Sequence, residues 1–237
     1  MKLYDELIHK TEDLMNHYHL QQLSVVSDLS YPVSAQNEMV LRSDMAYELG
    51  SQYFYALSST FITDSLEVEE GIYLLGDDLS NIKEDRNYAR ISIIKVKENT
   101  LGEGNNLYNA VKAIDNIKYH IRPLGYMMRV SSINKRESVR VSKEAIKKGI
   151  SFSDVGNQMM QLYKKNKMIE AVKIIFINLE SFDYKTLESY SKEESKITKA
   201  IDHMLSNTLM DCHSCNLEEV CNEVEGLKEL HFGLSNK

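Results

Sequence analysis

The chain has 237 residues, a formal net charge of −7, 43% hydrophobic and 27% charged residues, and only two prolines and ten glycines. This composition is typical of a globular protein with a sizeable core, and it argues against low-complexity or linker-like sequence. The acidic balance gives no global reason to expect nucleic-acid binding, and no apolar run reaches the roughly 18 residues that a membrane span needs.

Helical spacing of Leu3, Leu7, Leu14 and Tyr18 predicts a first helix over residues 3–20. The segment 24–50 is mixed, and we expect an irregular connection there. Four runs rich in Ile, Val and Tyr predict strands, at residues 71–76, 89–96, 126–131 and 171–178. Further helices are predicted over residues 106–121, 142–149, 153–166 and 183–207, the second of these with Ser142 as N-cap and Gly149 just past its end.

Helices interleaved with strands indicate an α/β, or mixed α+β, fold. We expect an N-terminal helix with its connecting segment over residues 1–42, and a central mixed sheet covered by helices over residues 43–180. A long helix and a Cys-rich metal module would occupy residues 181–237. The N-terminal segment carries acidic residues where a secretory signal peptide needs an apolar core, which predicts a cytoplasmic protein.

All three cysteines of the chain lie close together near its C-terminal end. Cys212, Cys215, Cys221 and His231 follow the spacing C-x2-C-x5-C-x9-H, in which the C-x2-C turn can aim two thiolates at one metal centre. In a reducing compartment, clustered cysteines are more often metal ligands or catalytic groups than disulfides. Three interpretations stay open at this point: a fortuitous cluster of free thiols, a structural zinc of Cys3His type, and an iron–sulfur cluster.

Four segments follow one another along the chain: DMAYELG (44–50), IYLLGDDLSNI (72–82), RVSKEAIKKGISFSDVG (140–156), and AVKIIFIN (171–178) with the long charged helix and C-x2-C after it. Together they resemble the acetyl-CoA synthase (beta) subunit of carbon monoxide dehydrogenase/acetyl-CoA synthase. The third segment is similar to that family's pattern R-V-S-K-x-A-x-x-K-G-x-x-F-x-x-Y-G, and with the cysteine tail it is the most specific part. The resemblance covers about residues 28–233, the family's central domain and the start of its nickel–iron–sulfur domain.

The resemblance implies a [4Fe-4S] cluster in the tail. The family binds its cluster with C-x2-C-x8-C-x9-C, so Cys212, Cys215 and Cys221 correspond to the first three ligands, the third reached through a shorter spacer. His231 stands at the fourth position, and imidazole is a known iron ligand in place of thiolate. The resemblance therefore favours iron–sulfur over zinc, with His231 as the expected fourth ligand.

In the family, nickel is bridged by the cysteine that corresponds to Cys215 and is held by a later C-x-C motif. This sequence has no fourth cysteine. We therefore expect no complete nickel site and no acetyl-CoA synthesis by this chain alone.

Residues 129–148 hold seven basic residues against two acidic ones, which predicts a local positive surface. Guanidinium groups grip phosphate bidentately. The resemblance implies coenzyme A binding by this domain through arginines and a tryptophan; Arg140 corresponds to one of the arginines, Arg129 stands in the tryptophan's place, and Tyr126 is the aromatic residue nearby. The candidate cofactor-binding residues are Arg129, Arg136, Arg140 and Lys143. A solvated basic face is the alternative interpretation.

We thus expect an iron–sulfur protein related to acetyl-CoA synthase but without its nickel site. It would transfer electrons, or serve a partner protein of one-carbon or corrinoid metabolism in an anaerobe, away from membranes and nucleic acids. Two alternatives stay open: a zinc-stabilised binding or assembly module without a redox role, and an acetyl-CoA synthase subunit completed by another chain. No catalytic residue is predicted.

Overall fold

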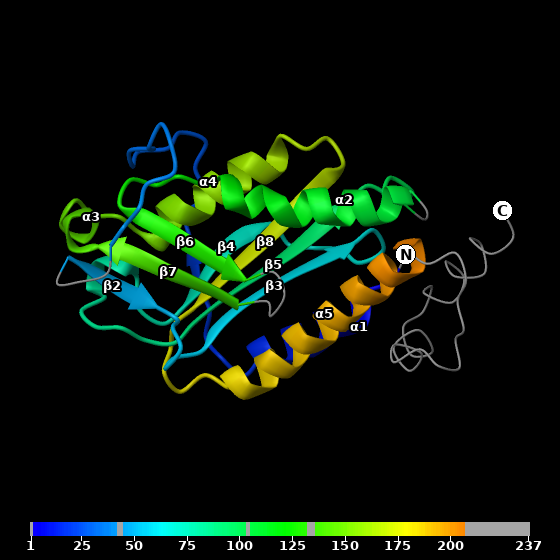
Figure 1. Ribbon diagram of the computed structural model, residues 1–237, viewed down its shortest axis with the longest axis horizontal. Coiled ribbons are helices and arrows are strands. Elements are labelled where there is room, and N and C mark those ends of the chain that lie inside the picture. Colours follow the sequence, from blue (N-terminus) through cyan, green and yellow to red (C-terminus); the bar gives the residue numbers. More distant parts are fainter. Residues whose placement is uncertain (1, 42–44, 103–104, 132–135, 207–237) are drawn as a thin grey trace, which may run out of the picture.

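Two β-sheets and five α-helices make up the part of the chain that the structure describes, residues 2–41, 45–102, 105–131 and 136–206 of a computed structural model (Figure 1). The helices are α1 (Asp5–Met15), α2 (Asn105–Asn116), α3 (Lys143–Lys147), α4 (Phe152–Lys164) and α5 (Tyr184–Ser206), with two short 3-10 helices, η1 (Leu79–Asn81) and η2 (Ile117–His120). The strands are β1 (Gln21–Leu23), β2 (Ala46–Leu49), β3 (Ala56–Thr63), β4 (Gly71–Leu75), β5 (Tyr88–Val96), β6 (Tyr126–Ser131), β7 (Arg136–Ser142) and β8 (Ile169–Ile177).

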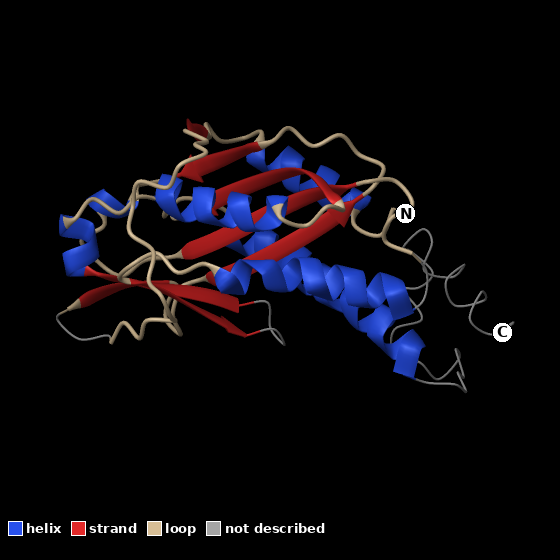
Figure 2. Cartoon of the chain, turned by 90° about the horizontal axis from the view of Figure 1, so that it is seen from above, coloured by secondary structure: helices blue, strands red, loops and turns tan. Residues whose placement is uncertain are grey.

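The main sheet has the strand order β1-β4-β8-β5-β3. Its strands β4 and β8 are parallel, as are β3 and β5, whereas β5 and β8 pair antiparallel. Helix α4 packs on β4 and β8, while α1 and α5 pack on β3, so helices lie on both sides of the sheet (Figure 1, Figure 2). Strands covered on both faces need no polar alternation, which is why β4 reads as the continuous apolar run GIYLL.

The small sheet has the order β2-β7-β6, and all of its pairs are antiparallel. Its central strand β7 packs against β3 and β5 of the main sheet. Side chains of β7 alternate: Glu137, Val139 and Val141 are buried, whereas Arg136 and Arg140 lie on the opposite, more accessible face. The packing of one face of β7 on the main sheet therefore turns its arginines outward.

Helix starts follow the predicted capping chemistry. The Ser142 hydroxyl accepts a hydrogen bond from the backbone N–H of Ala145 at 3.0 Å, as an N-cap does. Gly149 ends this segment with φ of +84°, a conformation that favours glycine. Helix α4 begins with a capping box in which Ser151 and Asp154 each bond the other's backbone.

The predicted fold class, a mixed α/β domain with an N-terminal helix and a helix-covered sheet, is confirmed, and each predicted helix and strand is present. The interpretation of residues 24–50 as irregular is wrong for β2, which forms because it pairs with β7 far along the chain. Strands β1, β3 and β7 were not predicted. None of the helices among the described residues is both long enough and apolar enough to cross a bilayer.

Candidate anion-binding site

The four predicted metal ligands, Cys212, Cys215, Cys221 and His231, lie outside the described residues. In the part of the chain that the structure does describe, no three His, Cys, Asp or Glu side chains gather closely enough to bind a metal ion. The predicted donor set of three thiolates and one imidazole has the chemistry of either an iron–sulfur or a zinc site. The structure does place the predicted cofactor-binding residues.

Three of those four residues line one groove of about 500 Å³ on the small sheet. Arg136 and Arg140 occupy alternate positions of β7 and so share a face. Arg129 of β6 reaches the same face because it pairs with Ser138, which lies between them on β7. We call this the arginine groove; its other lining residues are Glu48, Ser51, Gln52, Tyr53, Phe54, Ala56, Asp85, Val130 and Ser138.

The carboxylate of Glu48 offsets part of the positive charge in the arginine groove. Its oxygens lie 3.5 Å from Nε of Arg140 and 3.7 Å from Nη1 of Arg129. The Glu48 side chain is 7% exposed and that of Arg140 20%, whereas Arg129 is 54% exposed. Because Asp85 lines the groove as well, two carboxylates stand against three guanidinium groups. The predicted positive surface is therefore weaker here than the sequence count suggests.

A second groove, of about 760 Å³, runs along α5 and carries more positive charge. Arg136 lines it together with Lys192, Lys196 and Lys199, against the single carboxylate of Glu188. Lys192 pairs with Glu188 at 2.9 Å. We call this the lysine groove. It shares Gln52, Tyr53, Phe54, Ala56 and Arg136 with the arginine groove, so the two are continuous.

The sequence prediction missed these lysines because α5 was expected to be merely a charge-laced helix. A signal was present, since spacings of four and three residues put Lys192, Lys196 and Lys199 on one helical face. What the sequence could not show is that this face lies beside Arg136, more than fifty residues earlier in the chain.

Aromatic side chains flank the junction of the two grooves. Tyr53 is 83% exposed, and Tyr55 stacks on Tyr184 with ring centroids 5.3 Å apart. Nη2 of Arg136 donates a hydrogen bond to the carbonyl oxygen of Ser51 at 2.6 Å, which ties β7 to the same loop. The junction therefore offers an exposed phenol ring next to a fixed guanidinium group.

Two residues of this region that the sequence analysis named, Lys143 and Tyr126, lie away from the arginine groove. Lys143 is not among the residues that line the arginine groove, and its Nζ lies 4.8 Å from the centre of the Tyr47 ring. Tyr126 does not supply an aromatic surface there, because its side chain is 5% exposed and borders a different groove, of about 850 Å³, between α2, β6 and α5. That third groove mixes acidic and basic residues, so it offers no concentration of one charge.

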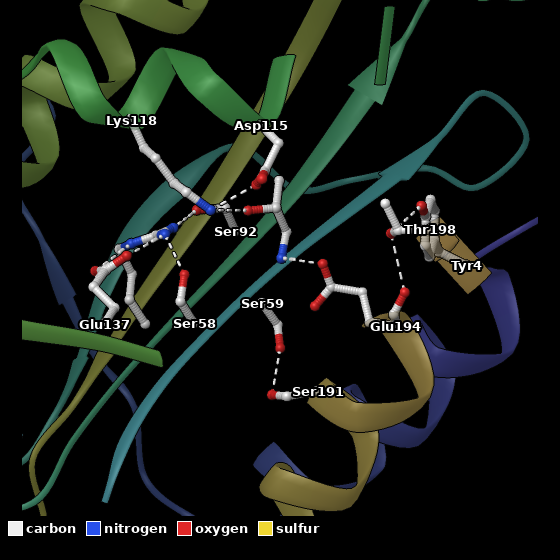
Figure 3. Close-up of polar contacts among 12 residues, drawn as sticks. Tyr4, Ser58, Ser59, Ser92, Asp115, Lys118, Glu137, Ser191, Glu194 and Thr198 are labelled. Carbon is white, nitrogen blue, oxygen red and sulfur yellow. Dashed lines mark hydrogen bonds and ion pairs between the residues drawn. The ribbon is translucent and has the colours of Figure 1, made fainter. Parts of the chain in front are cut away.

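A buried ion pair joins β5 of the main sheet to β7 of the small sheet, and Figure 3 shows its carboxylate, Glu137. Arg90 of β5 donates to Glu137 of β7 through Nε at 2.9 Å and Nη2 at 2.7 Å, and both side chains are at most 1% exposed. Arg90 also donates to Ser58 at 2.7 Å and to Ser92. Burial lowers the pKa of Arg90, but the charge of Glu137 more than offsets this, so the pKa stands above its ordinary value.

A second buried cation, Lys118, lies near this pair. Its Nζ donates to Asp115 at 2.6 Å and to the Thr60 hydroxyl at 3.2 Å, and the side chain is 1% exposed. Burial lowers the pKa of Lys118, and the nearby charge of Arg90 lowers it further, against the effect of Asp115. The interface between the sheets is thus an extended polar network in which each charge has an opposite partner.

Residues 28–181 match the family model described as the CO dehydrogenase/acetyl-CoA synthase complex beta subunit. The chain belongs to this family. It is also 24% identical over 201 residues to acetyl-CoA decarbonylase/synthase complex subunit beta 1 of Methanocaldococcus jannaschii. That alignment covers 80% of this chain and 26% of the relative, so the chain spans about a quarter of the relative's length.

The family match confirms the predicted resemblance. Its range contains the whole lining of the arginine groove, together with Arg90 and Glu137. It ends before α5, so the lysines of the second groove and the cysteine tail lie beyond the part that the CO dehydrogenase/acetyl-CoA synthase beta-subunit model matches. The arginine groove therefore lies within the matched range, whereas the lysines of the lysine groove lie outside it.

Proposed function

We propose that this member of the CO dehydrogenase/acetyl-CoA synthase beta-subunit family binds a phosphate-bearing ligand of the coenzyme A class across the two grooves. The observation that carries the proposal is the meeting of Arg129, Arg136 and Arg140 with three lysines of α5 around one continuous surface. The relative's name includes acetyl-CoA, which supports this ligand class. On this proposal, the basic segment 129–148 contributes to a binding surface and is not a face that contacts only solvent.

The chemistry of the grooves suits such a ligand. Guanidinium groups hold phosphate oxygens in a bidentate geometry, and lysines add compact charges that tolerate several positions. The exposed ring of Tyr53, 83% accessible, offers a face on which a planar base can stack. A polyphosphate with an aromatic end would use all three kinds of side chain.

Calorimetry with coenzyme A tests the proposal directly. The double variant Arg136→Glu/Arg140→Glu should weaken binding by more than a hundredfold, because each lost charge-assisted bond costs roughly 1.5–3 kcal/mol. Raising the salt concentration should weaken binding by the parent protein as well. Dephospho-coenzyme A, which has one phosphate fewer, should bind less tightly than coenzyme A.

The matched control is Lys147→Glu/Lys148→Glu. It makes the same charge change within the same basic stretch, at residues that do not line either groove. This control should retain most of the parent's affinity. Equal losses in the two double variants would mean that binding senses only net charge, and parental affinity in the arginine variant would show that coenzyme A does not bind here.

We propose in addition that Cys212, Cys215 and Cys221 hold a [4Fe-4S] cluster, with His231 as the fourth ligand. The spacing of the thiols and the family support this assignment. Held in a reducing cytoplasm, the cluster would pass electrons or serve a partner protein of one-carbon or corrinoid metabolism. The relative is named as a subunit of a complex, which supports a partner.

Metal analysis of protein purified without air tests the cluster. We expect about four iron atoms per chain, and loss of the broad visible absorption when any one of the three cysteines is replaced by serine. Stoichiometric zinc without iron would support the zinc-stabilised module instead. Exchange of the acetyl-CoA carbonyl with carbon monoxide, catalysed by the purified chain, would contradict our expectation that its nickel site is incomplete.

A further inference from the structure

Glu137 and the groove arginines lie on opposite faces of the same strand. Glu137 follows Arg136 directly and precedes Arg140 by three residues, but its side chain is fully buried while theirs line the groove. Besides the two bonds from Arg90, its Oε1 accepts a hydrogen bond from the Tyr88 hydroxyl at 3.3 Å. The carboxylate therefore connects β7 to β5 of the main sheet through several directional bonds (Figure 3).

Stability alone does not explain this pair. The desolvation of two buried charges largely cancels their attraction, and well-packed apolar residues of similar volume are often as stabilising or more so. Lys118, a second buried cation in the same network, adds to the charge that must be balanced. An ion pair, unlike an apolar contact, fixes the relative orientation of its two side chains, because two guanidinium N–H groups must meet two carboxylate oxygens.

Direction matters for β7 because its register decides which residues reach the groove. A slip by one residue would bring Arg136 and Arg140 to the buried face and Glu137 to the surface. The strand ladder with β2 and β6 fixes the pairing within the small sheet, but both of those strands belong to that sheet. The Arg90–Glu137 pair is a polar connection between β7 and the main sheet, the body on which the small sheet rests.

We infer that Arg90 and Glu137 are positioning residues for the arginine groove: the pair fixes where β7 lies on the main sheet, and thereby aligns Arg136 and Arg140 with the anionic ligand. The inference rests on the proposed function for its ligand, but the position of β7 can be measured without one. Arg90 and Glu137 themselves are buried and line neither groove.

The test replaces the whole pair by apolar residues, as Arg90→Met/Glu137→Leu. This variant should bind coenzyme A at least about tenfold more weakly, the equivalent of one lost charge-assisted bond. Its melting temperature measures the separate cost of leaving the hydroxyls of Ser58, Ser92 and Tyr88 without these partners. The control is Val139→Ala, on the same buried face of β7. It should lower the melting temperature and leave the affinity for coenzyme A unchanged, so that a loss of affinity in the double variant is not explained by a loss of stability.

A milder pair of variants applies even where the apolar pair fails to fold. Ser58→Ala removes a hydrogen bond to Arg90, whereas Ser59→Ala removes the neighbouring hydroxyl, which bonds Ser191 at 2.7 Å on the other side of β3. Both serines are 1% exposed. Coenzyme A binding should weaken with Ser58→Ala and stay at the parental level with Ser59→Ala.

Amide hydrogen exchange measures the placement of β7 without any ligand. In the variant without the ion pair, or in Ser58→Ala where that variant does not fold, exchange should quicken in β6 and β7 but not in β8. Unchanged exchange in β7 would overturn the inference, as would parental coenzyme A affinity despite faster exchange. A parent protein that binds no coenzyme A would instead refute the proposed function, and the exchange result would still decide the role of the pair.

Discussion

Glu48 sets how much charge the arginine groove presents to a ligand. Its carboxylate lies within 4 Å of both Arg129 and Arg140, so an incoming phosphate would compete with it for the same guanidinium groups. Glu48→Gln keeps the shape of the side chain and removes its charge. We expect coenzyme A, or inorganic pyrophosphate as a simpler probe, to bind about three- to tenfold more tightly to this variant in calorimetry.

The matched control is Glu144→Gln, which removes an exposed carboxylate from α3 that pairs with Lys148 and lines neither groove. It should change anion affinity little. Weaker binding by Glu48→Gln would mean that the carboxylate orients the two arginines more than it competes with the ligand.

At this residue scale the sequence identified some of the residues that line the candidate site. The basic stretch and the family motif were sufficient to select Arg129, Arg136 and Arg140, because these residues are close in sequence and their chemistry is evident. Glu48, Tyr53 and the α5 lysines were missed. They reach the groove only through strand pairing and helix packing between distant segments, which no local pattern encodes.

At the scale of elements, strand β3 shows why a sequence pattern can fail. Its sequence ALSSTFIT contains three consecutive Ser or Thr residues, yet the whole strand is buried. Each of these hydroxyls has a partner: Ser58 bonds Arg90, Ser59 bonds Ser191, and Thr60 bonds Lys118. Burial of polar groups is tolerated when they are hydrogen-bonded, but the partners come from other elements, so the sequence resembles a loop.

Gly76, in the turn after β4, is needed both for its backbone conformation and for space, whereas Gly149 is needed for its backbone conformation alone. Gly76 has φ of +122°, and an added Cβ would overlap Oδ1 of Asn178 and lie 2.7 Å from the backbone nitrogen of Leu179. Gly149 has φ of +84° but nothing within 4 Å of such a Cβ. Gly149→Ala should therefore show the backbone penalty alone, roughly 1–2 kcal/mol of unfolding free energy.

Gly76→Ala should lose clearly more, roughly 3 kcal/mol or more, because steric overlap adds to the backbone penalty. Urea unfolding of both variants measures the difference. Equal losses would indicate that the ends of β4 and β8 can move apart at little cost. Asn178 joins those ends by bonding Asp77 in both directions, so we expect that movement to be resisted.

At the scale of the whole molecule, buried tyrosines make stability depend on alkaline pH. Burial raises the pKa of Tyr88, Tyr126, Tyr163 and Tyr184. In the unfolded chain a tyrosine ionises near pH 10. Above about pH 10 the unfolded state therefore loses protons that the folded state keeps, and the free energy of unfolding falls as the pH rises further.

Urea unfolding between about pH 8 and pH 11 measures this decline. Tyr184→Phe should make it shallower, and at neutral pH it should cost little, because the buried Tyr184 hydroxyl has no hydrogen-bond partner among the described residues. Tyr53→Phe, at a ring that is 83% exposed, is the control for the removal of a phenol hydroxyl. If the free energy of unfolding of Tyr184→Phe falls as steeply with pH as that of the parent, Tyr184 does not contribute to the alkaline decline.

Lys118 makes the free energy of unfolding depend on pH in the direction opposite to that of the tyrosines. Because its pKa is lowered in the folded state, the unfolded chain binds a proton that the folded chain releases, from the lowered pKa up to about pH 10.4. Over that window the free energy of unfolding should rise with pH. Above about pH 10 the buried tyrosines act in the opposite direction.

Arg136 lines both grooves, and this shared position links them thermodynamically. An anion held in one groove engages the guanidinium group that the other groove also needs, so two separate anions would bind with negative cooperativity, each reducing the affinity for the other by the same factor. One elongated ligand that spans the junction avoids this conflict, because its charges reach Arg136 only once. If the grooves bind anions as proposed, the shared arginine would favour negative charges joined in one molecule over the same charges on two separate molecules.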